Sequence, residues 1–269
     1  MNNAEERVSK FYNELGWETE ENITEDAKRW EDLREHAREY VSKCRRRVLH
    51  HIPETGVNIL DMASGPIQYK EYLEYSKNFQ KRYCVDLSAK ALESAEKKIG
   101  DRGVFLHGSI FDIPLEEDFF DCSISLHTIY HIDKDKQEEA VRKLIAATKP
   151  GKPIVIVYDN PNTIFSVPLR IARAVRKFLK NSHQQTHPEE LSLYCYSHPL
   201  EWWNRFNDLA EIEILPWRSL RSDMQKILIP NNKIGSQMFK ILFNLEERFP
   251  NFFVKHFQYP TIVLTKRNK

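Results

Sequence analysis

The sequence predicts an α/β fold built on a doubly wound, mostly parallel sheet, and two observations lead to this prediction. Between residues 57 and 158, short apolar segments alternate with segments of helical character. The first two apolar segments, Val57–Asp61 and Lys81–Asp86, both end in an aspartate. Short buried strands that alternate with helices are typical of a parallel sheet covered on both faces. Ligands of such sheets bind beyond the carboxyl ends of the strands, so we expect a site there.

The composition argues against several classes of protein. The chain has 269 residues, which is enough for one large α/β domain with additions or for two small domains. Its 40 Lys and Arg nearly balance its 39 Asp and Glu, unlike the basic excess of a dedicated nucleic-acid binder. The four cysteines lack metal or CxxC spacing, so we expect a reduced, cytoplasmic protein. The polar N-terminus is unlike a secretory signal, and no apolar run approaches the roughly 18 residues of a membrane span.

The order of patterns divides the chain into four regions. Residues 1–52 are expected to form an N-terminal helical cap, with one long amphipathic helix over residues 24–51. Residues 53–160 are the expected core, and residues 161–210 an expected helical lid insertion. Residues 211–269 supply the last two strands, with a second helical insertion over residues 218–257. Both insertions leave from the edge where ligands bind, so we expect them to cover a pocket.

The individual strands follow from apolar runs bounded by turn residues. Beyond the two already named, the predicted strands are Val104–His107, Cys122–Leu126, Pro153–Tyr158, Glu211–Trp217 and Tyr259–Thr265. The predicted helix before the fifth strand ends at Lys149-Pro150-Gly151, where proline and glycine stop a helix.

The segment Asn58–Tyr69 has the pattern of a strand, a tight turn and a helix start. The small residues Ala63, Ser64 and Gly65 let a ligand approach the backbone, and Asp86 ends the next strand, where a carboxylate accepts hydrogen bonds from ribose hydroxyls. These features suit either a nicotinamide dinucleotide or S-adenosylmethionine. The dinucleotide fingerprint Gly-x-Gly-x-x-Gly fits poorly, because Ala63 and Gln68 take two of its glycine positions.

The same segment resembles the first motif of class I S-adenosylmethionine-dependent methyltransferases, Asp-x-Gly-x-Gly-x-Gly. Asp61, Ala63 and Gly65 are in register with it, and Ile67 replaces its third glycine. Three later segments are similar to further motifs of that family, in the family's order: Gly108–Leu115, Phe119–His131 and Leu144–Val157. The resemblance covers about Ile59 to Tyr158 and the final two strands.

This resemblance implies a Rossmann-like, doubly wound, mostly parallel seven-stranded sheet with a helical N-terminal segment and helical lid insertions. It makes residues 53–160 the S-adenosylmethionine-binding core. Ser109 stands where the family has its adenine-contacting acid, and Tyr12 and Trp17 either close over the cofactor or anchor the N-terminal segment. The cofactor-binding residues that it implies are Asp61, Ala63, Ser64, Gly65, Asp86, Leu87, Ser109, Ile110, Leu126 and Tyr12.

The candidate catalytic residues follow the fourth predicted strand. Methyl transfer needs a general base only when the acceptor is protonated at the working pH. We expect His131 or its neighbour Tyr130 to take that role, with His127 as a third candidate; the alternative is simple packing of this segment on the sheet. No metal site is expected, because Thr128 stands where His-Glu-x-x-His requires glutamate.

The expected function is methylation of an oxygen or nitrogen on a small-molecule or glycan acceptor. The alternatives are an RNA or protein methyltransferase, and a protein that binds the cofactor without transferring a methyl group. A cationic amphipathic segment at residues 169–180 is either a solvated face or a contact for a phosphate-bearing substrate or an anionic membrane surface. The sequence predicts neither the identity of the acceptor nor the oligomeric state.

Overall fold

Seven strands form one sheet in the order β5-β4-β3-β6-β7-β9-β8 in the computed structural model, which describes residues 3–20, 23–164 and 193–268. Strands β3 to β7 run parallel, while β9 runs antiparallel to both of its neighbours, β7 and β8. The predicted fold class is confirmed. The strands are β3 (Gly56–Met62), β4 (Phe79–Asp86), β5 (Gly103–His107), β6 (Cys122–Leu126), β7 (Pro153–Val157), β8 (Ala210–Arg218) and β9 (Tyr259–Lys266). A separate pair, β1 (Thr19–Glu20) and β2 (Ile23–Thr24), lies outside this sheet.

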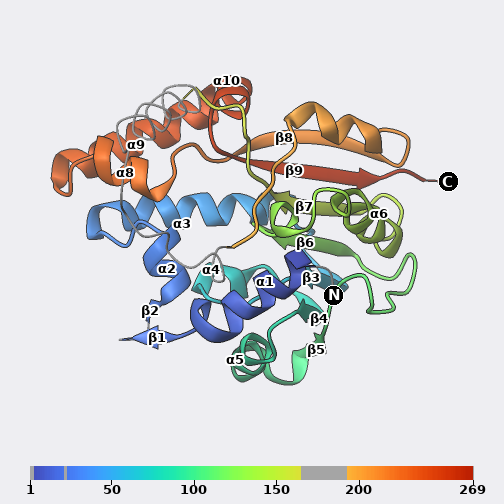
Figure 1. Cartoon of the computed structure of the whole chain (residues 1–269). Helices are drawn as coiled ribbons and strands as arrows, with labels where there is room; N and C mark the ends of the chain where they lie inside the picture. Colours follow the sequence, from blue (N-terminus) through green and yellow to red (C-terminus); the bar gives the residue numbers. More distant parts are fainter. Residues whose placement is uncertain (1–2, 21–22, 165–192, 269) are drawn as a thin grey trace, which may run out of the picture.

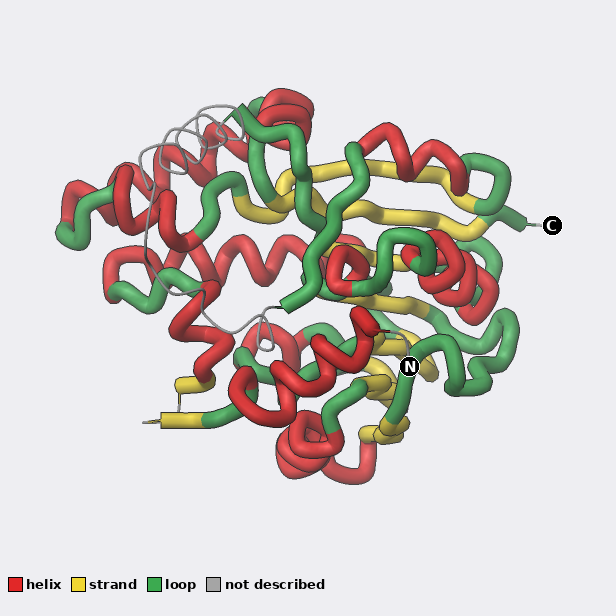
Figure 2. The backbone as a smooth tube through the Cα atoms, in the orientation of Figure 1, coloured by secondary structure: helices red, strands yellow, loops and turns green. Residues whose placement is uncertain are grey.

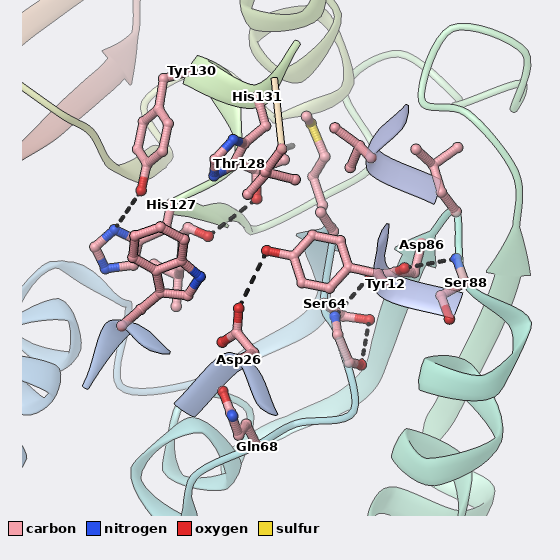
Figure 3. Close-up of a pocket in the computed structure, with 18 of the residues that line it drawn as sticks. Tyr12, Asp26, Ser64, Gln68, Asp86, Ser88, His127, Thr128, Tyr130 and His131 are labelled. Atoms are coloured by element: carbon pink, nitrogen blue, oxygen red, sulfur yellow. Dashed lines mark hydrogen bonds between the residues drawn. The ribbon is translucent and has the colours of Figure 1, made fainter. Parts of the chain in front are cut away.

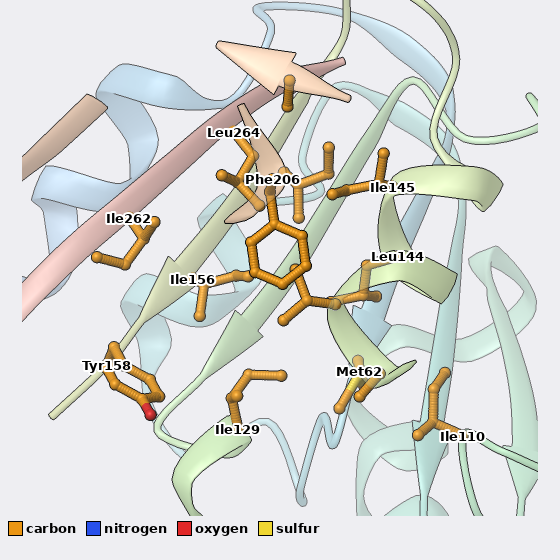
Figure 4. Packing of buried hydrophobic residues seen from close by; sticks show 14 of the residues in the cluster. Met62, Ile110, Ile129, Leu144, Ile145, Ile156, Tyr158, Phe206, Ile262 and Leu264 are labelled. Carbon is orange, nitrogen blue, oxygen red and sulfur yellow. The ribbon is translucent and has the colours of Figure 1, made fainter. Parts of the chain in front are cut away.

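Helices cover both faces of the sheet (Figures 1 and 2). The alternation of side chains along a strand sends neighbours to opposite faces, so Leu60 packs in one core cluster and Ile59 in the other. The first face is covered by α6 (Gln137–Ala147) and by the 3₁₀ segment η7 (Leu200–Phe206), whose Phe206 inserts among strand side chains (Figure 4). The second face is covered by helices that include α4 (Lys70–Glu74), α5 (Ala89–Ile99) and η3 (Arg47–His51).

The single helix predicted over residues 24–51 is wrong. The chain instead forms α2 (Glu25–Trp30), η2 (Glu35–Ala37), α3 (Arg38–Arg46) and η3, with an extended break after α2. Thr24 does cap α2, as its hydroxyl accepts from the backbone N–H of Ala27 at 3.1 Å. At the break, Asp32 accepts from the backbone N–H of Arg34 at 3.2 Å and from its guanidinium, and Glu31 pairs with Arg218 at 2.7 Å. These polar contacts of buried residues outweigh the apolar periodicity from which the helix was predicted.

The region between β8 and β9 contains α8 (Ser222–Leu228), α9 (Lys233–Arg248) and α10 (Pro250–His256). Residues of α9 and of the adjoining segments pack against α3 and form a core cluster of their own, with Tyr40 stacked on Phe239 at 4.9 Å. Helices α8 and α9 extend the molecule beyond the sheet, whereas α10 lies beside β8 (Figure 1). Most of the lid predicted for residues 161–210, including the cationic segment 169–180, lies outside the described residues.

The first helical elements, α1 (Asn3–Phe11) and the π-helical η1 (Tyr12–Gly16), precede the β1–β2 pair. Two short 3₁₀ turns, η4 (Gly100–Arg102) and η5 (Ile129–His131), follow α5 and β6. Among the described residues, no helix is both long enough and apolar enough to cross a membrane.

Candidate active site

The turn after β3 holds three residues in the left-handed backbone region. Ala63, Gly65 and Ile67 have φ values of 56°, 56° and 49°. These are the three positions at which the motif has glycine, so the chain keeps the conformation although two of the glycines are replaced. A left-handed conformation costs a non-glycine residue roughly 1–2 kcal/mol. Ile67 offsets this cost by burial, since its side chain is 1% exposed and packs among residues of β4 and α5.

Asp86, at the end of β4, ties this turn to the start of α5. Its carboxylate oxygens accept the backbone N–H groups of Gly65 and Ser88, each at 2.8 Å. Burial raises the pKa of Asp86 to about 6, so the group is ionised at neutral pH. Each carboxylate oxygen has a second lone pair, and Asp86 lines the cavity described below. It can therefore accept ribose hydroxyls while it holds the turn.

Asp61 lies beneath the turn in a buried ion pair. Arg82 donates to its carboxylate through Nε at 3.0 Å and through a second, shorter bond, and also donates to the carbonyl of Tyr72. The two residues are 3% and 1% exposed. Because both line the cavity, Asp61 stays a predicted cofactor contact, but its carboxylate already has a cationic partner.

A cavity of about 450 Å³ opens beyond the carboxyl ends of β3, β4 and β6. Its walls come from the motif turn, the N-terminal segment, the η5 region and the residues where β8 ends and β9 begins. Figure 3 shows side chains from several of these elements converging on the cavity. The predicted residues in the wall are Tyr12, Asp61, Ala63, Ser64, Gly65, Asp86, Leu87, Ile110, Leu126, His127, Tyr130 and His131.

Ser109 is the predicted residue that lies behind the wall. It is 3% exposed, and its hydroxyl donates to the carboxylate of Glu5 and accepts from the N–H of Phe111 at 3.2 Å. Glu5, from α1, itself lines the cavity. A carboxylate is therefore present next to Ser109, but it comes from a helix that is 104 positions away in the sequence. No local pattern in the sequence indicated this contribution.

The N-terminal segment covers the motif turn. Tyr12 stacks on Trp17 with ring centroids 4.8 Å apart, and its hydroxyl lies 3.4 Å from the Asp26 carboxylate. A Cβ added at Gly65 would lie 3.1 Å from the Trp17 ring, so glycine is needed for this approach as well as for the backbone angle. Within the described residues, the buried Trp17 Nε1 and Tyr69 hydroxyl have no hydrogen-bond partner, which suits a polar ligand in this part of the cavity.

The candidate catalytic residues occupy the turn after β6. His131 Nδ1 lies 2.7 Å from the carbonyl oxygen of Tyr194. Because a carbonyl only accepts, Nδ1 carries the hydrogen and Nε2 keeps its lone pair. Burial lowers the pKa of His131 to about 4, so the imidazole is neutral at pH 7.

His127 precedes η5 and has a φ of 59°, so it does not share a helical face with His131. Its Nδ1 lies 3.0 Å from the Tyr130 hydroxyl, and its ring packs edge-on against Trp217 at 4.5 Å. Burial and the Arg218 guanidinium hold the pKa of His127 well below its usual range. His127 is therefore a neutral partner of Tyr130.

Several wall residues were not predicted because distant segments bring them together. Arg218 is the last residue of β8, Tyr259 is the first residue of β9, and Asp26 comes from α2. Burial and the nearby Glu31 carboxylate together raise the pKa of Asp26 to about 7. No group of three His, Cys, Asp or Glu in the described part of the chain could hold a metal ion.

Comparisons with known proteins agree with this geometry. Residues 60–156 match a family described as methyltransferase domain. No curated protein sequence matches the chain. Three solved structures share the fold over most of both chains. A methyltransferase in complex with the Haloferax volcanii Trm112 methyltransferase activator has 15% identity and a TM-score of 0.54, covering 87% of this chain and 92% of that one.

The other two structures have similar scores. Magnesium protoporphyrin IX methyltransferase from Synechocystis PCC 6803, with bound S-adenosylhomocysteine, has 11% identity and a TM-score of 0.57, covering 99% of this chain and 100% of that one. A SAM-dependent methyltransferase from Archaeoglobus fulgidus has 18% identity and a TM-score of 0.51, covering 86% and 94%. Residues 60–156 therefore match a methyltransferase domain, and the seven-stranded sheet that contains them has the fold of class I methyltransferases.

Proposed function

We propose that this enzyme methylates an oxygen or nitrogen of a small-molecule or glycan acceptor. The observation that carries the proposal is the shared cavity, whose wall includes the motif turn, the η5 region and the ends of the 218–257 insertion. An acceptor beside His131 would lie in the same enclosed space as a cofactor bound at Asp86. Transfer depends on a short, in-line approach of the reacting atoms, which such an enclosure favours.

The residues that would hold the cofactor belong to separate elements. Asp86 would accept the ribose hydroxyls, the turn at Gly65 would let the ligand approach the backbone, and Glu5 would accept from the adenine amino group. Tyr12 and Trp17 would cover it, because they already lie over the turn. When bound, S-adenosylmethionine supplies a methyl group made electrophilic by its sulfonium charge.

The proton of the acceptor would go to His131 Nε2. The bond from Nδ1 to the Tyr194 carbonyl fixes the tautomer that leaves Nε2 free to accept. Tyr130, which lies against His127, would donate to the acceptor or orient it. Walls that include Ile110, Leu126 and Tyr259 would exclude water from the reacting atoms.

The fold is compatible with more than one class of acceptor. It is shared with an enzyme named for magnesium protoporphyrin IX, a small molecule, and with a methyltransferase that binds the Trm112 activator. The balanced charge of the chain favours the small-molecule class over RNA. Methylation of RNA or protein is the alternative function.

Calorimetry with S-adenosylhomocysteine, run beside NAD, tests the cofactor. We expect micromolar binding of S-adenosylhomocysteine alone. Transfer of a radioactive methyl group to a panel of small molecules, glycans, RNA and proteins then tests the acceptor, with His131→Ala as the control. Salt-dependent binding and labelling of RNA would overturn the small-molecule proposal. Tight cofactor binding with no labelling in any class would support a binding protein without transferase activity.

A further inference from the structure

The 218–257 insertion presents an exposed apolar stripe on α9. The stripe consists of Ile234, Met238, Ile241 and Leu245, which are 66%, 38%, 59% and 40% exposed. Their spacing of four, three and four residues places them on one helical face. The neighbouring face, with Phe239 at 2% exposure, packs on α3. An outward face of a helix in a globular protein is normally polar, so this stripe requires an explanation.

Both neighbouring helices also carry exposed apolar side chains. Ile227 and Leu228 of α8 are 75% and 45% exposed, and Phe249 and Phe252 at the start of α10 are 50% and 53% exposed. Figure 1 shows the three helices gathered at one end of the molecule. We call these four residues and the stripe together the α8–α10 face. A concentration of large apolar side chains on one part of a surface marks an interaction site.

Basic residues border the stripe. Lys233, Lys240 and Arg248 are exposed and recur at intervals of seven and eight residues, which places them in a row beside it. Two of the nearby carboxylates, Glu246 and Glu247, are paired with Arg47 at 2.9 Å and 2.7 Å. Lys240 lies 4.0 Å from Glu39 of α3, so the positive charge of the row rests mainly on Lys233 and Arg248. An apolar stripe bordered by lysine and arginine is the pattern of a helix that lies in a membrane interface.

The same insertion is continuous with the active site. Arg218 and Arg221, near its start, line the cavity, as do Gln258 and Tyr259, which directly follow it. The helices that carry the α8–α10 face are therefore connected directly to residues of the cavity wall. A partner bound at this face would lie on the same insertion as the active site, so an acceptor held by that partner would be near the cavity.

We propose that the α8–α10 face docks on an anionic membrane surface. The stripe and the two phenylalanines enter the boundary between headgroups and acyl chains, and Lys233, Lys240 and Arg248 contact lipid phosphates. Charge complementarity selects this partner over a second copy of the chain, because two copies joined at this face would bring their basic rows together.

Sedimentation with vesicles tests the proposal on the full chain. One set of vesicles is pure phosphatidylcholine, and the other contains about 30% phosphatidylglycerol. We expect binding to the anionic vesicles that weakens in high salt. Ile234→Asp with Ile241→Asp should reduce it at least tenfold, and Lys233→Glu should reduce it several-fold. Val57→Asp is the matched control, because Val57 is 44% exposed and lies outside the face.

Folding of each variant is checked by its unchanged thermal unfolding and unchanged affinity for S-adenosylhomocysteine. Equal vesicle binding by wild type and the double aspartate variant would overturn the proposal. So would a wild type that binds neither vesicle composition. If light scattering then shows a dimer that the double variant abolishes, the occupant is a second copy. If it shows a monomer, the face binds neither a membrane nor a second copy.

Discussion

Asp86 combines a structural role with the expected cofactor contact, since the carboxylate that holds Gly65 and Ser88 also lines the cavity. We expect Asp86→Ala to weaken binding of S-adenosylhomocysteine by about 2–4 kcal/mol through the loss of two charge-assisted bonds. Calorimetry at pH 7.5 measures this, with circular dichroism to verify folding. Unchanged affinity in a folded variant would remove Asp86 from the site.

Asp26 gives a pH-dependent prediction about stability. Its pKa is about 7 in the folded protein, above its ordinary value near 3.8. Because the folded protein holds the Asp26 proton more tightly than the unfolded chain does, this proton stabilises the fold fully below about pH 4, and the stabilisation is lost as the pH rises to 7. Asp26→Asn has no carboxyl group to ionise, so the variant does not lose stability in this way. The stability of the variant relative to wild type should therefore rise by about 3–4 kcal/mol between pH 4 and pH 8.

Urea denaturation at pH 4, 6 and 8 measures the effect, and the difference between the two proteins cancels the other titrating groups. Asparagine keeps an oxygen that can accept from Tyr12, so the contact with η1 is preserved. Stability curves that stay parallel across this pH range would contradict a raised Asp26 pKa.

His131→Ala should lower kcat on the order of a hundredfold if His131 is the base, with little effect on cofactor affinity. Because the folded pKa is about 4, His131 is already deprotonated at pH 5. We therefore expect no loss of wild-type turnover from its titration between pH 5 and 8. Tyr130→Phe is the companion variant, which removes the neighbouring hydroxyl and leaves the imidazole. Normal turnover by His131→Ala would mean that another group is the general base or that the reaction needs none.

At the scale of elements, two variants in the turn after β3 measure the cost of backbone strain and the gain from side-chain packing separately. Ala63→Gly removes a left-handed alanine, so we expect a gain of about 0.5–1 kcal/mol after the entropy cost of glycine. Ile67→Gly removes the same kind of strain but empties a buried position, so we expect a net loss of roughly 2 kcal/mol or more. Chemical denaturation of the two variants tests this, and a gain from both would mean that Ile67 contributes no packing.

The strands were predictable because each carries its own apolar run. Ile154 and Val155, for example, lie in opposite core clusters, as the alternation of a buried strand requires. The break after α2 was not predictable, because it depends on Glu31 reaching Arg218, 187 positions away. The same holds for Glu5 beside Ser109 in the candidate site. Local patterns predict elements, whereas contacts between distant side chains depend on how those elements pack.

At the scale of the whole molecule, Phe206 anchors η7 to the main core cluster of the sheet and α6. It is fully buried among side chains of the sheet and α6 (Figure 4). Phe206→Ala should lower the free energy of unfolding by about 3–5 kcal/mol. Phe252→Ala, at a position that is 53% exposed, should change it by less than about 0.5 kcal/mol. Equal losses from both variants, measured in urea, would contradict this assignment of the core.

The position of β9 between β7 and β8 has a consequence for synthesis of the chain. The ribosome makes β8 and the three insertion helices before β9, yet β9 is the one described strand with which β8 forms backbone pairs. Until residues 259–266 emerge, the edge of β7 and the edge of β8 that β9 later pairs are both exposed in the nascent chain. Unpaired edges are sites of aggregation. Chaperone demand during translation should therefore peak between the emergence of β8 and the closure of the sheet by β9.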